Sequence, residues 1–161
     1  MELDVSTLLK ILNKQNSLIE ELRDLANEQL QALKWDDLNK IIKITSHQEY
    51  IGRQLAVLEQ QRLMILKKFS QEHGIEIEHF SDLPMHTSSN DFAEIQKSRD
   101  EIINGSQKLK EEQGMNALLL KQGLKYAERM LGILNSKKTS TYGQTGNMKR
   151  AGNIRIVDAN A

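Results

Sequence analysis

Apolar residues recur at intervals of three and four along most of this 161-residue chain. That spacing is typical of amphipathic α-helices, because it places the apolar side chains on one face. The pattern predicts three helices, at about residues 3–33, 37–72 and 91–136. Lys34-Trp35 ends the first segment, and Asp36 or Asp37 is expected to cap the second. His73-Gly74 is expected to end the second, because glycine adopts the left-handed conformation of a helix C-cap.

Each predicted helix carries one main apolar stripe, which we expect to form the core. The first stripe comprises Val5, Leu8, Leu12, Ile19, Leu22, Ala26 and Leu33, with Gln15 and Gln29 in the two remaining slots. The second comprises Leu38, Ile41, Leu55, Leu58, Ile65 and Phe69. The third comprises Phe92, Ile95, Ile102, Leu109, Ala117, Leu120, Leu124, Ala127, Leu131 and Leu134.

These stripes predict an all-α fold, an elongated antiparallel three-helix bundle or coiled coil over residues 1–138. The third helix is too long for its partners, and residues 139–161 lack helical periodicity and are expected to form a flexible tail. Aromatic residues make up only 4% of the chain and proline occurs once, which fits helices packed through narrow Leu and Ile stripes. The connection between the second and third helices is long, and we expect Ile75, Phe80 and Leu83 to pack over one end of the bundle.

A second apolar stripe appears on the third helix from Met115 onward. It comprises Met115, Leu119, Tyr126, Met130 and Ile133. Two stripes exceed what the groove between two neighbouring helices can cover. In one interpretation the excess is covered, either by residues 75–84 or by a second copy of the chain, and the second copy would make the free protein a homodimer. In the other interpretation the stripe is an exposed patch for a partner helix. Methionine favours adaptable binding at such a patch.

The net charge of the chain gives no support for nucleic acid or an anionic membrane as a partner. The formal net charge is zero, although five Lys or Arg residues face one Asp from Lys137 onward. A short basic tail with a single Tyr142 is at most a weak, non-specific site for nucleic acid. The N-terminus has no signal-peptide pattern, and no apolar run is long enough for membrane insertion.

The sequence contains no pattern that we interpret as catalytic. There is no cysteine, and "YGQTGNMK" resembles neither a P-loop nor a dinucleotide fingerprint. Glu76 and His79 form one Glu-x-x-His, whereas a di-metal bundle needs two such motifs on facing helices. We therefore expect a protein-binding protein, with no enzymatic activity, cofactor or metal.

Three stretches resemble the FlgN family of flagellar type III export chaperones. They are "EQLQALKWDDLNKIIKITSHQEYIGRQLAVLEQQR", "MNALLLKQGLKYAERMLGIL" with Asn116, Leu118 and Leu119, and "TYGQTG" with Tyr142, Gly143 and Gly146. The resemblance implies a cytoplasmic chaperone that binds the C-terminal helical regions of hook-associated proteins, keeps them from assembling early and delivers them for export. It also implies contact with components of the export gate.

The resemblance implies that the C-terminal part of the chain binds the substrate. The additional apolar stripe of the third helix lies in this part of the chain. The predicted substrate-binding residues are Met115, Leu118, Leu119, Tyr126, Met130 and Ile133. The predicted tail contacts are Tyr142, Gly143 and Gly146. The alternative is a structural or oligomerising coiled-coil adaptor that has no secretion substrate and uses the same stripe as a seam.

Overall fold

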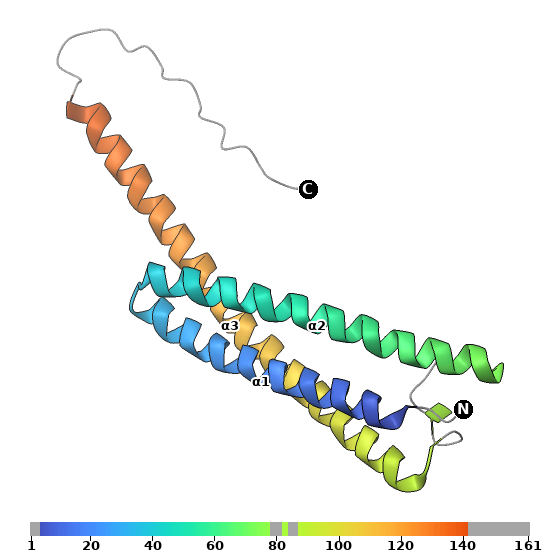
Figure 1. Ribbon diagram of the computed structural model, residues 1–161. Coiled ribbons are helices and arrows are strands. Elements are labelled where there is room, and N and C mark those ends of the chain that lie inside the picture. The colour runs from blue at the N-terminus through green and yellow to red at the C-terminus, as the bar shows by residue number, and fades with distance from the viewer. Residues whose placement is uncertain (1–3, 78–81, 84–86, 142–161) are drawn as a thin grey trace. The chain divides into compact units, whose positions relative to one another are not determined.

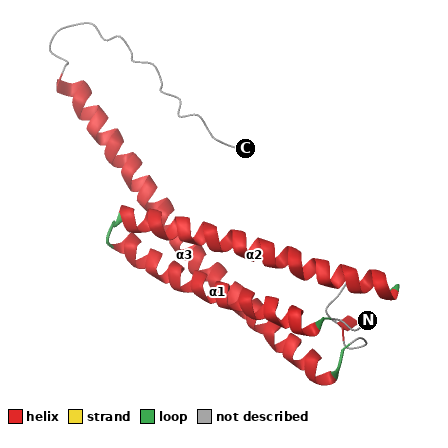
Figure 2. Ribbon diagram, in the orientation of Figure 1, coloured by secondary structure: helices red, strands yellow, loops and turns green. Residues whose placement is uncertain are grey.

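The computed structural model describes residues 4–77, 82–83 and 87–141, and its long elements are three α-helices (Figures 1 and 2). They are α1 (Val5–Lys34), α2 (Leu38–His73) and α3 (Ser89–Thr141). No strand occurs in the described ranges, so the predicted all-α class is confirmed. The helix ends lie close to those expected, except that α3 continues past residue 136 to Thr141. A division between bundle and tail at residue 139 stays a prediction.

The chain divides into two compact units, Met1–Lys121 and Gln122–Ala161. The first unit contains α1, α2 and the first part of α3. The second contains the remainder of α3, which is described as far as Thr141. Each unit is described below by itself.

Local chemistry explains where α1 and α2 begin and where α2 ends. The Asp4 carboxylate accepts a hydrogen bond from the Thr7 amide at 3.0 Å, and Asp37 accepts one from the Lys40 amide at 3.1 Å. A carboxylate at this position satisfies an amide that has no partner within its own helix. At the end of α2, Gly74 has a φ of 63° and its amide donates to the Ser70 carbonyl. These are the caps that the sequence predicts at Asp37 and Gly74.

The start of α3 is fixed by a reciprocal pair of side-chain hydrogen bonds. The Asp91 amide donates to the Ser88 hydroxyl oxygen at 3.2 Å, and the Ser88 hydroxyl donates to the Asp91 carboxylate at 2.7 Å. Asp91 also places a negative charge in the first turn, where the helix dipole is positive. The helix therefore begins directly after Ser88, slightly earlier than the sequence pattern suggests.

Within the first unit, α1 is the central helix and packs against both α2 and α3. The turn at 35–37 makes α1 and α2 antiparallel (Figure 1). α3 runs parallel to α1, because Ser98 bonds Asn13 and, further along both helices, Glu112 bonds Arg23. The buried residues of α1 are Leu8, Ile11, Leu12, Gln15, Leu18, Ile19, Leu22, Leu25, Ala26, Gln29 and Ala32. The first unit is thus the predicted up-down-up bundle.

Two apolar clusters fill this bundle. One comprises Leu8, Leu12, Phe69, Leu83 and Ile95. The other comprises Leu18, Leu22, Leu25, Ala32, Ile44 and Ile51. Leu83 is buried in the first cluster, as predicted for the connection, whereas Ile77 rather than Ile75 packs against that cluster; Phe80 lies outside the described residues.

The apolar stripe predicted for α2 is partly wrong. Leu38, expected in the core, is 66% exposed, whereas Ile44 and Ile51 are buried and were not assigned. Leu38 is the first residue after the Asp37 cap and precedes the turns of α2 that face α1. Gln15 and Gln29 are both buried, in agreement with the slots predicted for them.

Candidate partner-binding surfaces

A buried polar cluster holds α3 against α1 near the end of the first unit. The Asn116 side-chain amide donates to the Ala26 carbonyl at 2.8 Å and to the Gln29 side-chain oxygen at 3.1 Å. Gln29 in turn donates to the Thr45 hydroxyl of α2 at 3.4 Å. The cluster therefore joins all three helices. Asn116 belongs to the "MNALLL" stretch, and its position gives that asparagine a structural role.

Asn116 is also the last buried side chain among the described residues of α3. Met115 and Leu118 flank it and are 53% and 50% exposed, and Leu119 is half-buried. The described part of the connection packs instead with Leu8 and Ile95, so it does not cover these residues. Three of the six predicted substrate-binding residues thus lie beside the polar cluster, two of them exposed.

In the second unit, every described side chain of α3 from 122 to 134 is exposed. Tyr126, Met130 and Ile133 are 66%, 40% and 50% exposed, respectively. They lie four and three residues apart, so they share one face of the helix. These are the remaining predicted substrate-binding residues, and they form an accessible apolar stripe.

The expected core stripe of this segment is exposed as well, which corrects the sequence analysis. Leu124, Leu131 and Leu134 are 62%, 60% and 54% exposed, and Ala127 shares their face. Ala117 and Leu120 in the first unit are likewise exposed. The sequence pattern identified both faces as apolar but assigned one of them to a core, since periodicity does not reveal whether a partner helix is present.

The two stripes of residues 122–134 are adjacent on the helix. At 100° per residue, the apolar side chains cover about half of the circumference. The other half carries Lys125, Glu128 and Arg129, with Gln122 and Gly132. We call the apolar half, made of Leu124, Tyr126, Ala127, Met130, Leu131, Ile133 and Leu134, the distal apolar surface. Sequence reasoning missed the contribution of Leu124, Leu131 and Leu134 to this accessible surface.

The predicted tail contacts Tyr142, Gly143 and Gly146 lie outside the described residues. Their assignment stays a prediction, as does that of the rest of residues 142–161.

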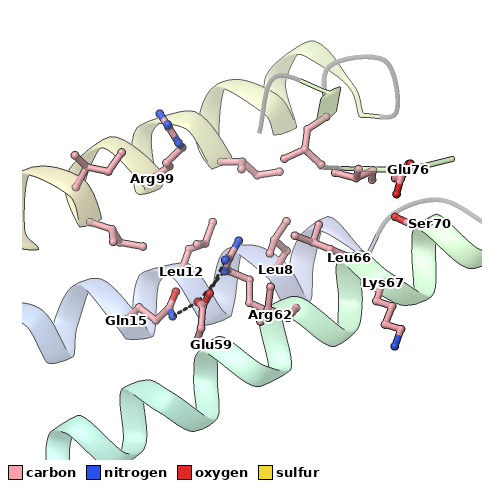
Figure 3. A pocket seen from close by; sticks show the side chains of 16 residues that line it. Leu8, Leu12, Gln15, Glu59, Arg62, Leu66, Lys67, Ser70, Glu76 and Arg99 are labelled. Atoms are coloured by element: carbon pink, nitrogen blue, oxygen red, sulfur yellow. Dashed lines mark hydrogen bonds and ion pairs between the residues drawn. The ribbon is translucent and has the colours of Figure 1, made fainter. Parts of the chain in front are cut away.

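A cavity of about 650 Å³ lies inside the first unit between the three helices and the connection. Leu8 and Leu12 line it from α1, and Glu59 and Arg62 face each other on α2 (Figure 3). Arg99 lies on α3 at the opposite wall (Figure 3). Most of the lining is apolar, so the cavity suits apolar side chains more than a polar metabolite.

An ion pair at the wall of this cavity shifts the pKa values of both of its partners, Glu59 and Arg62. The Arg62 guanidinium donates to both Glu59 oxygens, at 2.6 and 2.9 Å, and Gln15 donates to the same carboxylate at 3.3 Å. The hydrogen bonds from Arg62 lower the pKa of Glu59, and those to Glu59 raise the pKa of Arg62. Both groups therefore stay charged near neutral pH, which favours a structural ion pair over a proton-transfer role.

Two further classes of site are absent from the described part of the chain. No group of three His, Asp or Glu side chains there could hold a metal ion, and His79 and His86 lie outside it. No described helix combines the length and apolar character that a membrane crossing requires.

Comparison with known proteins identifies the family. The family model described as FlgN protein matches residues 1–150. Comparisons with curated proteins and with solved structures gave no match. The matched range covers nearly the whole chain, including α1, α2, α3 and part of the C-terminal segment. The chain therefore belongs to the FlgN family, a family of flagellar export chaperones rather than of enzymes.

Proposed function

We propose that this protein is a cytoplasmic chaperone that binds the C-terminal helical segments of hook-associated proteins, prevents their premature assembly and delivers them for export. The single observation that carries the binding step is the exposure of the distal apolar surface. Seven of its side chains lie on one half of a helix and are all exposed. Family membership supplies the flagellar context.

The spacing of the distal apolar surface favours a helical substrate. Tyr126, Met130 and Ile133 form one ridge, and Leu124 and Leu131 belong to the ridge beside it. An amphipathic substrate helix can lay its own apolar ridge between the two, as in helix-in-groove recognition. The first unit would contribute a contact of the same kind through Met115, Leu118 and Leu119.

The chemistry of the surface suits a chaperone that must later release its substrate. Met130 is flexible and polarisable, so it adapts to more than one apolar partner. A substrate segment that folds only on binding loses conformational entropy, which lowers its affinity for a given buried area. Binding is then strong enough to shield the segment and weak enough for delivery.

Point substitutions in the full chain test the assignment. Met130→Glu and Leu131→Glu each place a charge in the distal apolar surface and should weaken binding of a hook-associated C-terminal peptide at least about tenfold, because the charge loses solvation on contact. Lys125→Gln makes the same change of net charge near the centre of the polar half and is the matched control. Calorimetric titration measures affinity, and circular dichroism monitors helicity.

The outcomes separate the proposal from its alternatives. Unchanged affinity in both charged variants would remove the distal apolar surface as the binding site. A loss of helicity would mean that these residues are core, for example in a homodimer. Sedimentation distinguishes the oligomerising adaptor: a dimer that ignores the peptide supports that alternative, whereas a one-to-one complex with the peptide supports the chaperone.

We also propose that the C-terminal tail contributes to contact with the substrate or the export gate through Tyr142, Gly143 and Gly146. Tyrosine is a favoured contact residue at protein interfaces, and glycine permits turns that other residues resist. Deleting residues 139–161 should therefore weaken one of the two interactions. If a pull-down detects no loss of either, the tail has no part in binding.

A further inference from the structure

An apolar groove runs between α1 and α2 in the first unit. It consists of two hollows of about 540 and 340 Å³. Leu58 lines both, so the hollows are adjacent and together extend along α2 from Tyr50 to Lys68. On α1 the lining residues are Thr7, Lys10, Ile11, Lys14 and Leu18. α3 contacts α1 through other residues, among them Asn13, Asn16 and Arg23.

The floor and one border of this groove are apolar. Ile11 and Leu18 are buried, and Leu58 and Ile65 are half-buried. The border on α2 exposes three large side chains, since Tyr50, Val57 and Met64 are 53%, 57% and 62% exposed. From Tyr50 to Lys68 the helix rises about 27 Å, so a partner helix of roughly 18 residues would fill the groove.

The charge of the lining has one sign. Four cationic side chains, Lys10, Lys14, Arg53 and Lys68, line the two hollows, and no Asp or Glu does. Lys68 has an acidic neighbour, Glu72, at 4.0 Å. Lys10, Lys14 and Arg53 form no ion pair with any described residue. Lys10 attracts the Asp4 carboxylate without a close contact, so the hydrogen-bond donors of all three cations remain available to a partner.

We propose that the α1/α2 groove is a docking site for a partner protein's amphipathic helix whose apolar stripe is bordered by Asp and Glu. The partner's apolar side chains would pack on Leu58 and Ile65, and its carboxylates would pair with Lys10, Lys14 and Arg53. Opposite charges around an apolar centre steer association and fix the register of the helix. The inference uses no residue of α3 and is independent of the proposed substrate site.

Other occupants fit the charge less well. In a second copy of the chain the same groove is basic, so a symmetric dimer would oppose like charges. The residues of this chain from Lys137 onward carry five Lys or Arg and one Asp, again the same sign. An anionic lipid surface also matches the charge, but the apolar floor follows two packed helices over the length of several turns, which matches the ridge of a third helix.

The test uses the full chain and two synthetic helical peptides of about 18 residues with the same leucine stripe. One peptide has Glu on both borders of the stripe and the other has Lys. The expected result is that the Glu peptide binds, shifts the methyl resonances of Ile11, Leu58 and Met64, and binds less tightly as salt is added. The Lys peptide should bind at least about tenfold more weakly.

Charge reversal identifies the groove. The triple variant Lys10→Glu, Lys14→Glu and Arg53→Glu should lose affinity for the Glu peptide about tenfold or more and gain affinity for the Lys peptide. All three side chains are exposed, so the fold should persist. The matched control reverses the exposed residues Lys97, Lys108 and Lys110 of α3 and should change affinity by at most about twofold.

Five results would overturn the proposal, and the first four concern the peptides. The first is equal affinity for both peptides, and the second is an equal loss of affinity in the control variant. The third is that peptide-induced shifts are confined to Met130 and Leu131. The fourth is that anionic phosphatidylglycerol vesicles abolish the groove shifts because the vesicles occupy the groove. A concentration-dependent dimer that shifts Ile11 and Leu58 in the absence of peptide would assign the groove to self-association and would also overturn it.

Discussion

The bundle and residues 122–134 have the same apolar periodicity but opposite exposure. Ile95 of α3 is 1% exposed in the bundle, whereas Leu131 of the same helix is 60% exposed. Both side chains are large and aliphatic and both lie on the stripe that the sequence assigns to the core. Periodicity therefore determines which face of a helix needs a partner, and neighbouring elements determine whether it has one.

The two regions also differ in how polar groups are used. In the bundle, Asn116 and Gln29 are buried and bond between helices, which fixes the register of α3 against α1. Between 122 and 134, Lys125, Glu128 and Arg129 all lie on the half opposite the distal apolar surface. The first arrangement specifies one fixed packing, and the second leaves the apolar half of the helix uncovered.

The largest expected effect is the loss of stability on truncating a core residue of the bundle. Ile95→Ala should lower the free energy of unfolding by about 2–5 kcal/mol, because it removes buried methylenes and leaves a cavity. Leu131→Ala, an equivalent truncation of the distal apolar surface, should change it by less than about 0.5 kcal/mol. Urea denaturation of both variants measures the difference.

Leu131→Ala serves as the matched control, because it removes a similar aliphatic volume from an exposed position. If it destabilised the protein as much as Ile95→Ala does, residues 122–134 would be packed in the free protein. Repeating the measurement over a range of protein concentrations would then show whether a second copy provides that packing.

The next effect concerns the polar cluster. Asn116→Ala should cost about 1–3 kcal/mol, because the Gln29 oxygen loses a buried donor. We expect the lower half of this range, since the Asn116 side-chain oxygen is itself buried without a partner and its removal is favourable. Gln113→Ala, at an exposed neighbouring position, is the control in the same urea experiment. Equal stability of the two variants would mean that the cluster does not anchor α3.

Much of the fold could be predicted from the sequence because its signals are local. The Asp37 cap and the Gly74 stop depend on residues within one turn, and both are observed. Ile44 and Ile51 were missed because the residues between Ile41 and Leu55 include His47 and Gln48, which obscure the stripe. Their burial depends on contact with α1, which is a tertiary effect.

The candidate sites were less predictable for the same reason. The stripe of Tyr126, Met130 and Ile133 was visible as apolar periodicity, but the exposure of Leu124 and Leu131 was not. The α1/α2 groove combines Lys10 and Lys14 with Arg53, residues that are distant in the chain. Only the antiparallel packing of two helices brings them together.

A smaller effect distinguishes the bundle through pH. Because Arg62 lowers the pKa of Glu59, the carboxylate is stabilised in the folded state. Its contribution is complete above the unfolded pKa of about 4.5 and is lost as pH falls through the lower folded pKa. The pair is partly exposed, so we expect a contribution of about 0.2–1 kcal/mol. Glu59→Gln should reduce the loss of stability between neutral pH and pH 3, measured by urea denaturation.

A double-mutant cycle with Arg62→Gln checks the assignment. The two substitutions should be non-additive at neutral pH, and the non-additivity should be smaller at pH 3, because the ion pair weakens as Glu59 takes up a proton. Additivity at both pH values would mean that the ion pair at the cavity wall contributes nothing to folding.

The smallest expected change in bundle stability separates two classes of glycine. Nothing lies within 4 Å of a Cβ placed at Gly123 or Gly132, whereas at Gly105 it would lie 3.1 Å from Cγ2 of Ile19. Gly123→Ala and Gly132→Ala should each favour the local helix by about 0.5–1 kcal/mol, because alanine loses less backbone entropy.

We therefore expect slower amide hydrogen exchange in residues 122–134 and little change in the free energy of unfolding of the bundle. In Gly105→Ala the same gain in helix propensity is offset by displacement of Ile19, so the bundle should be no more stable. The free energy of local opening from hydrogen exchange can be compared with the free energy of unfolding in urea. If Gly123→Ala raised both by the same amount, the two regions would unfold as one cooperative unit. The contrast between them would then be one of exposure alone.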